Sequence, residues 1–242
     1  MRKKQVLGDA LPYLDMNELS GNLIVIEGTD GVGRSTQVEM LKEWLEVKGY
    51  GVITTGWTQS ALMSPAIEEA KRGHTLNVNT YSLLYAADFA DRFEHIILPA
   101  LKGGFIVLAD RYIYTAIARA IVRGSKEEWI RGVYGFALIP DLVVYLKISP
   151  DALIPRVINR EMLMKRYWEE ALGEGLDYWE SGMDLKLGED FYESFLEYQK
   201  KILAEFDRMA REHKFKVVDA TKDSDDIHKI LQKAITPILS RA

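Results

Sequence analysis

A glycine-rich segment near the N-terminus carries the residues with the clearest chemistry. From position 28 onward it contains Gly28, Thr29, Asp30, Gly31, Val32, Gly33, Arg34, Ser35 and Thr36. The spacing fits the pattern G-x-x-x-x-G-K-[S/T], except that Arg34 takes the place of the usual lysine. Glycines let successive backbone N–H groups turn toward one anion, and a following helix directs its positive end at the same point. The segment therefore predicts a phosphate cradle for ATP, with Arg34 on the outer phosphates and the Ser35 hydroxyl on Mg²⁺.

A second pair of chemically capable residues, Asp110 and Arg111, closes an apolar run over residues 105–110. If this run is a parallel strand beside the one that precedes the loop, both side chains lie at the edge of the sheet where ligands bind. There the Asp110 carboxylate can hold Mg²⁺, and the Arg111 guanidinium can neutralise a transferring phosphoryl group. We therefore predict that Arg34, Asp110 and Arg111 carry the chemistry, with Ser35 and Asp110 serving the metal.

Five short apolar runs, rich in valine and isoleucine, must supply the frame that positions these groups. They cover residues 22–28, 51–55, 105–110, 141–148 and 215–220. Apolar residues on both faces are typical of strands buried in a parallel sheet. Segments with helical periodicity alternate with these runs. The alternation predicts an α/β fold of three layers, built on a doubly wound parallel five-stranded sheet.

The composition narrows the class of protein. The 242 residues carry a formal net charge of −5 and show no basic stripe, which argues against a nucleic-acid binder. The absence of cysteine excludes disulfides and thiolate chemistry, and no apolar stretch approaches the roughly 18 residues of a membrane span. The first residues do not read as a secretory signal, so we expect a cytoplasmic protein with no membrane partner.

The chain is expected to form one domain with two appendages. Residues 1–20 are interpreted as an N-terminal arm and residues 21–242 as a single domain. Within that domain, residues 155–190 form a long polar connection, and a connection of this length usually marks a lid. A mobile basic lid can close over phosphates and exclude water, so we predict a catalytic role for Arg160 or Arg166. Interleaved glutamates are equally compatible with a solvated helix face.

Four segments together resemble the thymidylate kinase family. They are IEGTDGVGRSTQ (26–37), YAADFADRFEHIILPALKGGFIVLADRY (85–112), PDLVVYLKISPD (140–151) and VVDATKDSDDIHKIL (217–231), and the resemblance covers about residues 22–239. It implies a P-loop fold of the nucleoside monophosphate kinase type, with ATP and Mg²⁺ as cofactors. It further implies transfer of the γ-phosphoryl group to a nucleoside monophosphate, dTMP first among them, and a homodimer packed through the helix around residues 80–101.

The same resemblance assigns roles to single positions. Asp30 matches an acidic loop residue that contacts the acceptor sugar and organises the site. Asp110 and Arg111 match a pair that serves Mg²⁺ and the phosphates. Tyr85 stands where an aromatic ring stacks on the acceptor base, and Thr221, in the turn 220–222, matches the segment beside adenine.

Several positions on the acceptor side depart from the family pattern. The stretch at 54–58 reads Thr-Thr-Gly-Trp-Thr and lacks the arginine that often follows the second strand and binds the acceptor phosphate. Phe89 stands where an arginine usually reads thymine, and Arg92, one turn later, could replace it. Arg119 stands where a tyrosine is usual. We treat Tyr85, Phe89, Arg92 and Arg119 as the candidate substrate-binding residues.

These departures leave two other interpretations open. One is a P-loop kinase for a different small or polyphosphate-type substrate, since residues 181–199 faintly resemble a polyphosphate kinase class and Tyr178 replaces an arginine of the lid pattern. The acidic balance of the chain does not favour the basic channel that a polyphosphate would need. The other is an ATP-binding protein with little turnover, because Arg34 is longer and planar where lysine is compact.

Overall fold

The computed structural model describes residues 4–73, 77–156, 182–189 and 191–239. The predicted lid residues Arg160 and Arg166 lie outside the described residues, as does Tyr178. In the described part of the chain, no helix combines the length and the apolar character needed to cross a membrane.

Five parallel strands form one sheet in the order β2-β3-β1-β4-β5. They are β1 (Asn22–Glu27), β2 (Val52–Gly56), β3 (Ile106–Asp110), β4 (Leu142–Lys147) and β5 (Lys216–Asp219). This confirms the predicted α/β fold with its five-stranded parallel sheet. Because β1 lies in the middle of the sheet, the loop that follows it emerges between the carboxyl ends of β3 and β4, where ligands bind in such sheets.

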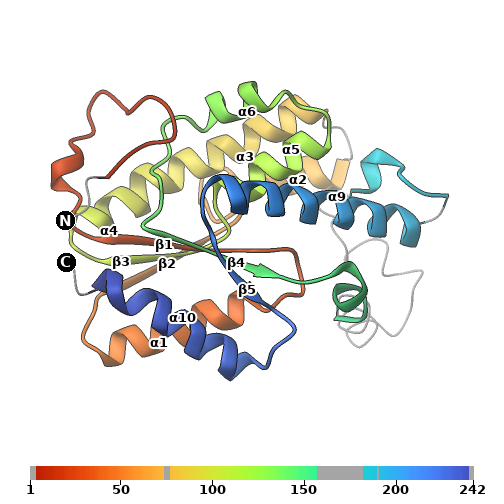
Figure 1. Ribbon diagram of the computed structural model, residues 1–242. Helices are drawn as coiled ribbons and strands as arrows, with labels where there is room; N and C mark the ends of the chain where they lie inside the picture. The colour runs from red at the N-terminus through yellow and green to blue at the C-terminus, as the bar shows by residue number, and fades with distance from the viewer. Residues whose placement is uncertain (1–3, 74–76, 157–181, 190, 240–242) are drawn as a thin grey trace.

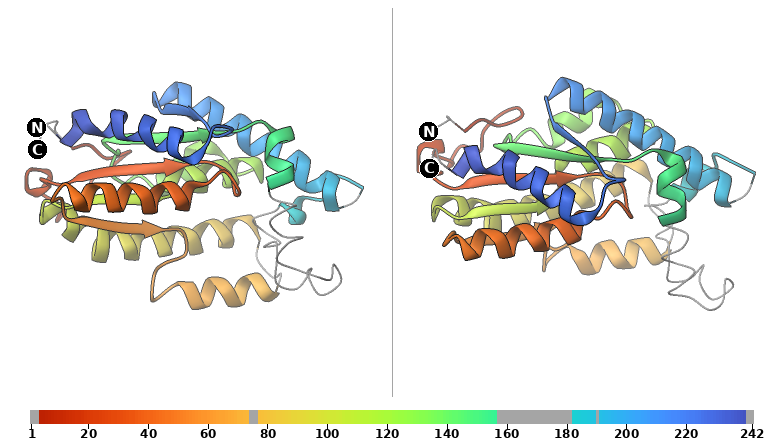
Figure 2. Two further views of the ribbon diagram at one scale, coloured as in Figure 1. Left: turned by 90° about the horizontal axis from the view of Figure 1, so that it is seen from below. Right: turned by 60° about the horizontal axis from the view of Figure 1, so that its bottom comes forward.

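Helices cover both faces of the sheet and complete the three layers (Figure 1, Figure 2). On one face α1 (Arg34–Val47) packs beside α10 (Ser224–Leu239). The other face carries α3 (Val78–Arg92), α4 (Leu98–Lys102), α5 (Ile113–Val122), α6 (Glu127–Val133) and α9 (Phe191–Glu212). Helix α2 (Ser64–Gly73) lies against α3. The described residues also form three short helical segments, which are η1 (Met16–Glu18), η2 (Phe93–Ile97) and η3 (Met183–Leu185).

Side chains along the central strand alternate between two hydrophobic cores. In β1, Leu23 and Val25 face the layer that contains α3, α5 and α9, whereas Ile24 and Ile26 face α1 and α10. Burial on both faces explains why the strand is apolar at successive positions. Its last residue, Glu27, is also fully buried, and a buried carboxylate requires hydrogen-bond partners.

The N-terminal arm lies outside the sheet but is packed on the domain. Val6 forms an isolated antiparallel bridge with Leu138, and Leu19 is buried in the core beside α4. Lys4 pairs with Asp141, whose carboxylate also accepts a hydrogen bond from the backbone of β1. These contacts fasten the arm next to the strand that leads into the glycine-rich loop.

Candidate active site

The loop between β1 and α1 has the backbone that a phosphate cradle requires. Gly28, Gly31 and Gly33 have φ values of 149°, 78° and 90°, which residues with a Cβ rarely adopt. A Cβ on Gly28 would also lie 2.9 Å from the carbonyl oxygen of Leu146. Gly33 is the N-cap of α1, so the positive end of that helix faces the loop.

Arg34, the first residue of α1, turns its guanidinium back into the loop. Its Nη1 donates to the carbonyl oxygen of Gly28 at 2.6 Å and to that of Thr29. Its Nε donates to Asp110 Oδ1 at 2.7 Å, and Nη2 lies 3.4 Å from Asp30 Oδ1. The side chain therefore uses the planar fork that a lysine lacks. Burial opposes its charge, but the nearby carboxylates, Asp30 first, hold the pKa of Arg34 above its ordinary value.

Asp110 lies at the end of β3, directly beside β1, as the sequence predicts. The register places Asp110 opposite Ile26, and its Oδ2 accepts a hydrogen bond from Ser35 Oγ at 2.8 Å. Mg²⁺ prefers oxygen ligands and usually combines one or two carboxylates with phosphates and water. The Ser35 hydroxyl and the Asp110 carboxylate fit that preference. In the described ranges, no cluster of three or more His, Cys, Asp or Glu side chains offers a fuller metal site.

Two further arginines meet Asp30 on the other side of the loop. Arg111 Nη2 donates to Asp30 Oδ1, and Arg119 Nη2 lies 3.8 Å from Asp30 Oδ2. Both arginines are buried and line a small cavity together with Gly28 and Thr29. The backbone of Arg111 has a φ of 71°, a conformation that costs a residue with a Cβ about 1–2 kcal/mol. Strained backbone conformations are common at functional sites, so this strain indicates that function requires the orientation of the Arg111 side chain.

Glu27 is a site residue that the sequence reasoning missed. Its Oε1 accepts hydrogen bonds from the backbone N–H of Tyr112 at 2.9 Å and of Thr115 at 3.3 Å. Its Oε2 accepts one from Thr115 Oγ1 at 2.6 Å. Burial raises the pKa of Glu27 to about 7 in spite of these bonds. The available signal was a charged residue closing an otherwise apolar strand, immediately before the glycine-rich loop.

An aromatic group joins two of the predicted substrate-binding residues. The ring of Tyr85 is buried, with its centre 4.8 Å from that of Trp57 and 4.4 Å from that of Tyr81. The guanidinium of Arg119 lies 5.5 Å from the centre of the Trp57 ring. Tyr85 and Arg119 thus belong to one group, connected by Trp57, the residue that follows β2.

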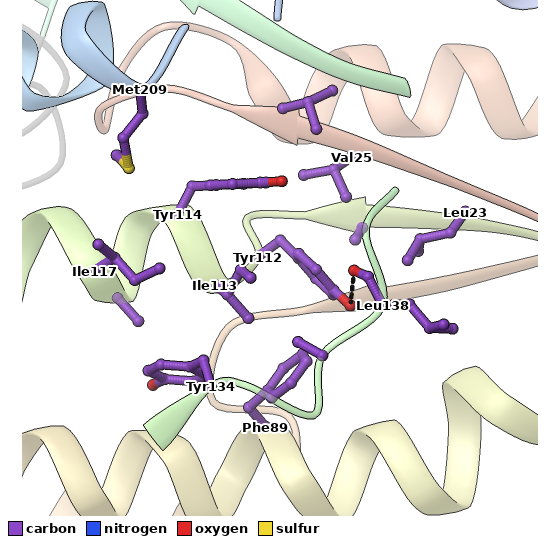
Figure 3. Packing of buried hydrophobic residues seen from close by; sticks show 14 of the residues in the cluster. Leu23, Val25, Phe89, Tyr112, Ile113, Tyr114, Ile117, Tyr134, Leu138 and Met209 are labelled. Atoms are coloured by element: carbon purple, nitrogen blue, oxygen red, sulfur yellow. Dashed lines mark hydrogen bonds between the residues drawn. The ribbon is translucent and has the colours of Figure 1, made fainter. Parts of the chain in front are cut away.

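Phe89 belongs to the hydrophobic core instead (Figure 3). Its side chain is 2% exposed. Ring centres of Phe93, Tyr112, Tyr134 and Phe136 lie between 5.1 and 5.7 Å from its own. Because ring packing accounts for this side chain, we do not carry it into the proposed substrate site.

Arg92 is also buried and ties α3 to the end of β2. Its Nε donates to Asp88 Oδ2 at 2.9 Å, and its Nη1 donates to Thr55 Oγ1 at 3.1 Å. The other oxygen of Asp88 accepts a hydrogen bond from the backbone N–H of Ser60 at 2.9 Å. These bonds brace the segment that contains Trp57, and a direct contact between Arg92 and a base stays a prediction.

The turn predicted to lie beside adenine follows β5 at the same edge of the sheet. Thr221 donates to Asp219 Oδ1 from its backbone N–H at 2.9 Å and from Oγ1 at 2.7 Å, and these bonds lower the pKa of Asp219. Gln37 of α1 donates to both the carbonyl and the hydroxyl oxygen of Ser224 at 2.9 Å. The turn is thereby held near the helix that begins at the loop, and its contact with adenine stays a prediction.

Several known proteins are similar in sequence to this chain. The family model described as thymidylate kinase matches residues 26–172. A probable thymidylate kinase 2 of Saccharolobus solfataricus is 36% identical over 219 residues, which are 90% of this chain and 96% of that protein. A probable thymidylate kinase of Pyrococcus horikoshii is 29% identical over 87% of this chain and 93% of its own length. The thymidylate kinase of Caldicellulosiruptor saccharolyticus is 34% identical over 57% of this chain and 70% of its own. The chain belongs to the thymidylate kinase family.

Proposed function

We propose that the protein transfers the γ-phosphoryl group of ATP to the phosphate of dTMP, giving dTDP and ADP. Its family makes it a nucleoside monophosphate kinase. The observation that carries the proposal is the meeting of two charged groups at the carboxyl end of β1 and β3. Arg34, Ser35 and Asp110 form one group, and Asp30 and Arg111 form the other.

The chemistry of transfer explains why these residue types are needed. An oxygen of the acceptor phosphate bonds to the γ-phosphorus while the bond from that phosphorus to the β–γ bridging oxygen breaks. Negative charge spreads over the transferring group and the leaving ADP, so cations that are fixed in advance lower the barrier. The loop backbone and Arg34 would hold the donor phosphates. Arg111, on the other side of Asp30, would meet the transferring group and the acceptor phosphate.

Magnesium fits this site as a cofactor. When bound, Mg²⁺ neutralises charge on the donor phosphates and orients them. The Ser35 hydroxyl and the Asp110 carboxylate are the side chains that would hold it, since their oxygens already lie 2.8 Å apart. Ser35 donates that hydrogen bond to Asp110, and binding of the ion would replace it.

The acceptor would lie on the side of the loop where Asp30, Arg119 and the aromatic group meet. The half-buried ring of Trp57, which packs on the buried ring of Tyr85, offers an apolar surface for a base. Asp30 offers an acceptor for sugar hydroxyls, and Arg119 offers donors to the sugar or phosphate. The same arrangement favours a nucleotide over an acceptor without a ring.

We also propose a homodimer and a cytoplasmic location, with support from the family resemblance. Tyr81, Tyr85 and Phe89 of α3 are buried within the chain, so an interface through this helix would use its outer side, where Leu83 is 51% exposed. Light scattering after size exclusion should give the mass of two chains. A single-chain mass at micromolar concentration would contradict the homodimer.

A transfer assay tests the proposed function. The purified protein is incubated with ATP, Mg²⁺ and one acceptor at a time: dTMP, dUMP, UMP, CMP, AMP, GMP or short-chain polyphosphate. ADP formation is followed by a coupled assay, and the phosphorylated product is identified by ion-exchange chromatography. We expect dTDP, with dTMP giving the highest kcat/KM. Product from another acceptor with none from dTMP would overturn the acceptor assignment, and ADP release without any phosphorylated product would overturn transfer.

A further inference from the structure

Glu27 connects the phosphate loop with the segment that follows β3. It is the last residue of β1 and precedes Gly28 of the phosphate loop, and its exposed fraction is 0%. Its carboxylate reaches the segment after β3, where it binds Tyr112 and Thr115. A side chain in this place can fix the position of that segment relative to the loop.

Glu27 supplies the cap of a helix that belongs to another part of the chain. Tyr112 is the N-cap residue of α5, and its side chain makes no capping hydrogen bond to the described part of that helix. The first N–H groups of a helix need acceptors, and a carboxylate is favoured by the helix dipole. Glu27 Oε1 accepts from the N–H of Tyr112 and, in the first turn, from that of Thr115. The start of α5 is therefore held by β1.

Two hydrogen bonds to the end of β1 hold the backbone at Arg111. Its own N–H donates to the carbonyl oxygen of Ile26 at 3.0 Å, and the N–H of the next residue, Tyr112, donates to Glu27. Its left-handed backbone, with a φ of 71°, persists only where the surroundings hold it. The two residues that precede the phosphate loop thus hold both sides of Arg111, and its guanidinium binds Asp30 within that loop.

We propose that Glu27 is a positioning residue for phosphoryl transfer, which fixes Arg111 against the phosphate loop through the first turn of α5. This inference rests on the proposed function, because Arg111 is assigned there to the reacting phosphates. A misplacement of about 1 Å in a group that meets the reacting atoms can cost roughly 10²-fold in rate. Precise placement of Arg111 is therefore a sufficient reason to keep a carboxylate buried at this point.

In the described part of the chain, the charged and titratable groups near Glu27 come from four elements. They are Arg34 of α1, Arg111 after β3, Tyr114 of α5 and Tyr145 of β4, which the register places opposite Glu27. Burial dominates and raises the pKa of Glu27 to about 7, whereas both arginines act in the opposite direction. Burial also raises the pKa of Tyr114, which leaves a neutral phenol beside the carboxylate. Protonation near pH 7 would weaken the acceptor that holds Tyr112 and Thr115, so the hold on Arg111 should depend on pH.

Two substitutions separate the effect of the length of the Glu27 side chain from the effect of its charge. Glu27→Asp keeps the charge but shortens the side chain by one methylene, and we expect kcat to fall roughly 10²-fold. Glu27→Gln keeps the reach and removes the charge, and we expect a fall of about tenfold at pH 8, worth ~1.4 kcal/mol. In both variants the Kd for ATP, measured by calorimetry, should stay within a factor of about three, because the loop backbone is unchanged.

The dependence of kcat on pH distinguishes a positioning role from a purely structural one, because a purely structural role would leave this dependence unchanged. Wild-type kcat should fall on the acid side with a midpoint near pH 7, and this limb should vanish in Glu27→Gln. Thr115→Val removes one hydrogen bond that lowers the pKa of Glu27, so it should keep the acid limb and move it to higher pH. Because this variant preserves the carboxylate, it keeps the test decisive if a Glu27 variant fails to fold.

Specific outcomes would overturn the inference. Glu27→Asp and Glu27→Gln with kcat within twofold of wild type would refute it, as would an acid limb that survives unchanged in Glu27→Gln. Loss of ATP binding in parallel with kcat would show that Glu27 shapes the loop and not Arg111. A wild-type protein that makes no dTDP would refute the proposed function instead, which keeps the two failures distinct.

Discussion

Replacing Arg34 tests the position at which this chain departs from the phosphate-loop pattern. Its Nε binds the Asp110 carboxylate, and its Nη1 binds the carbonyl oxygens of Gly28 and Thr29. These contacts use two nitrogens of one planar group. A lysine places its donors on a single nitrogen and lacks the planar fork that meets both partners here. We expect Arg34→Lys to lower the rate of transfer and not to raise it.

The contacts set the size of the effect. A hydrogen bond to a charged group contributes about 1.5–3 kcal/mol. Loss of the bond between Arg34 and Asp110 should therefore lower kcat/KM roughly 10- to 10²-fold in Arg34→Lys. Arg34→Ala removes the cation itself, and loss of one electrostatic stabiliser of the transition state typically costs about 3–4 kcal/mol, or roughly 10²–10³ in rate.

Initial rates of ADP formation show whether Arg34 supports transfer or marks an ATP-binding protein with little turnover. The assay compares wild type, Arg34→Lys and Arg34→Ala with dTMP and with the nucleotide panel. Arg211→Lys, an exposed position on α9, is the matched control for an arginine-to-lysine change away from the loop. A very slow wild type together with a gain of about tenfold or more in Arg34→Lys, more than 1.4 kcal/mol, would refute the reasoning.

Three further predictions concern single charged residues. Asp110→Ala and Arg111→Ala should each lower turnover roughly 10²–10³-fold, far more than either substitution lowers stability, and near-normal turnover in both would mark the pair as structural. Burial raises the pKa of Glu27 from 4.5 to about 7. The contribution of Glu27 to the free energy of unfolding is therefore complete below pH 4.5, and about 3 kcal/mol of it is lost as the pH rises through 7. Glu27→Gln should then be more stable than wild type at pH 8 by urea unfolding, and an equal difference at pH 5 and pH 8 would contradict this. Arg123→Met should cost about 3–5 kcal/mol in the same assay, because it strands the Asp184 carboxylate that Arg123 binds at 2.9 Å, and a smaller loss would show that solvent compensates.

The loop and the sheet could be predicted because each follows from local rules. The glycine spacing at Gly28, Gly31 and Gly33 lies between an apolar strand and a helix, and only a turn with left-handed residues connects the two there. Asp110 and Arg111 could be placed because all parallel strands end at the same edge of the sheet. The sequence thereby identified both of the polar groups that meet in the site.

Contacts between distant segments could not be predicted in the same way. Glu27 and Thr115 are 88 positions apart in the sequence, and the hydrogen bonds between them depend on the register of β1 against β3. Phe89 and Arg92 lie three positions apart on α3, so periodicity places them on neighbouring sides of the helix without saying what either one contacts. The structure places Phe89 among core rings and Arg92 on Asp88.

The charges in the site have a consequence for the form of ATP that it binds. In the described part of the chain, three arginines and three carboxylates lie around the phosphate loop: Arg34, Arg111, Arg119, Glu27, Asp30 and Asp110. With all six ionised, their formal charge is zero. Free ATP therefore meets no net positive charge from these side chains, whereas Mg²⁺ removes two negative charges from the nucleotide. The Ser35 hydroxyl and the Asp110 carboxylate can ligate that ion, and its two positive charges offset charge on the bound nucleotide that these balanced side chains leave uncompensated. The substitution of arginine for lysine in the loop preserves this balance, because it changes the shape of the cation and not its charge.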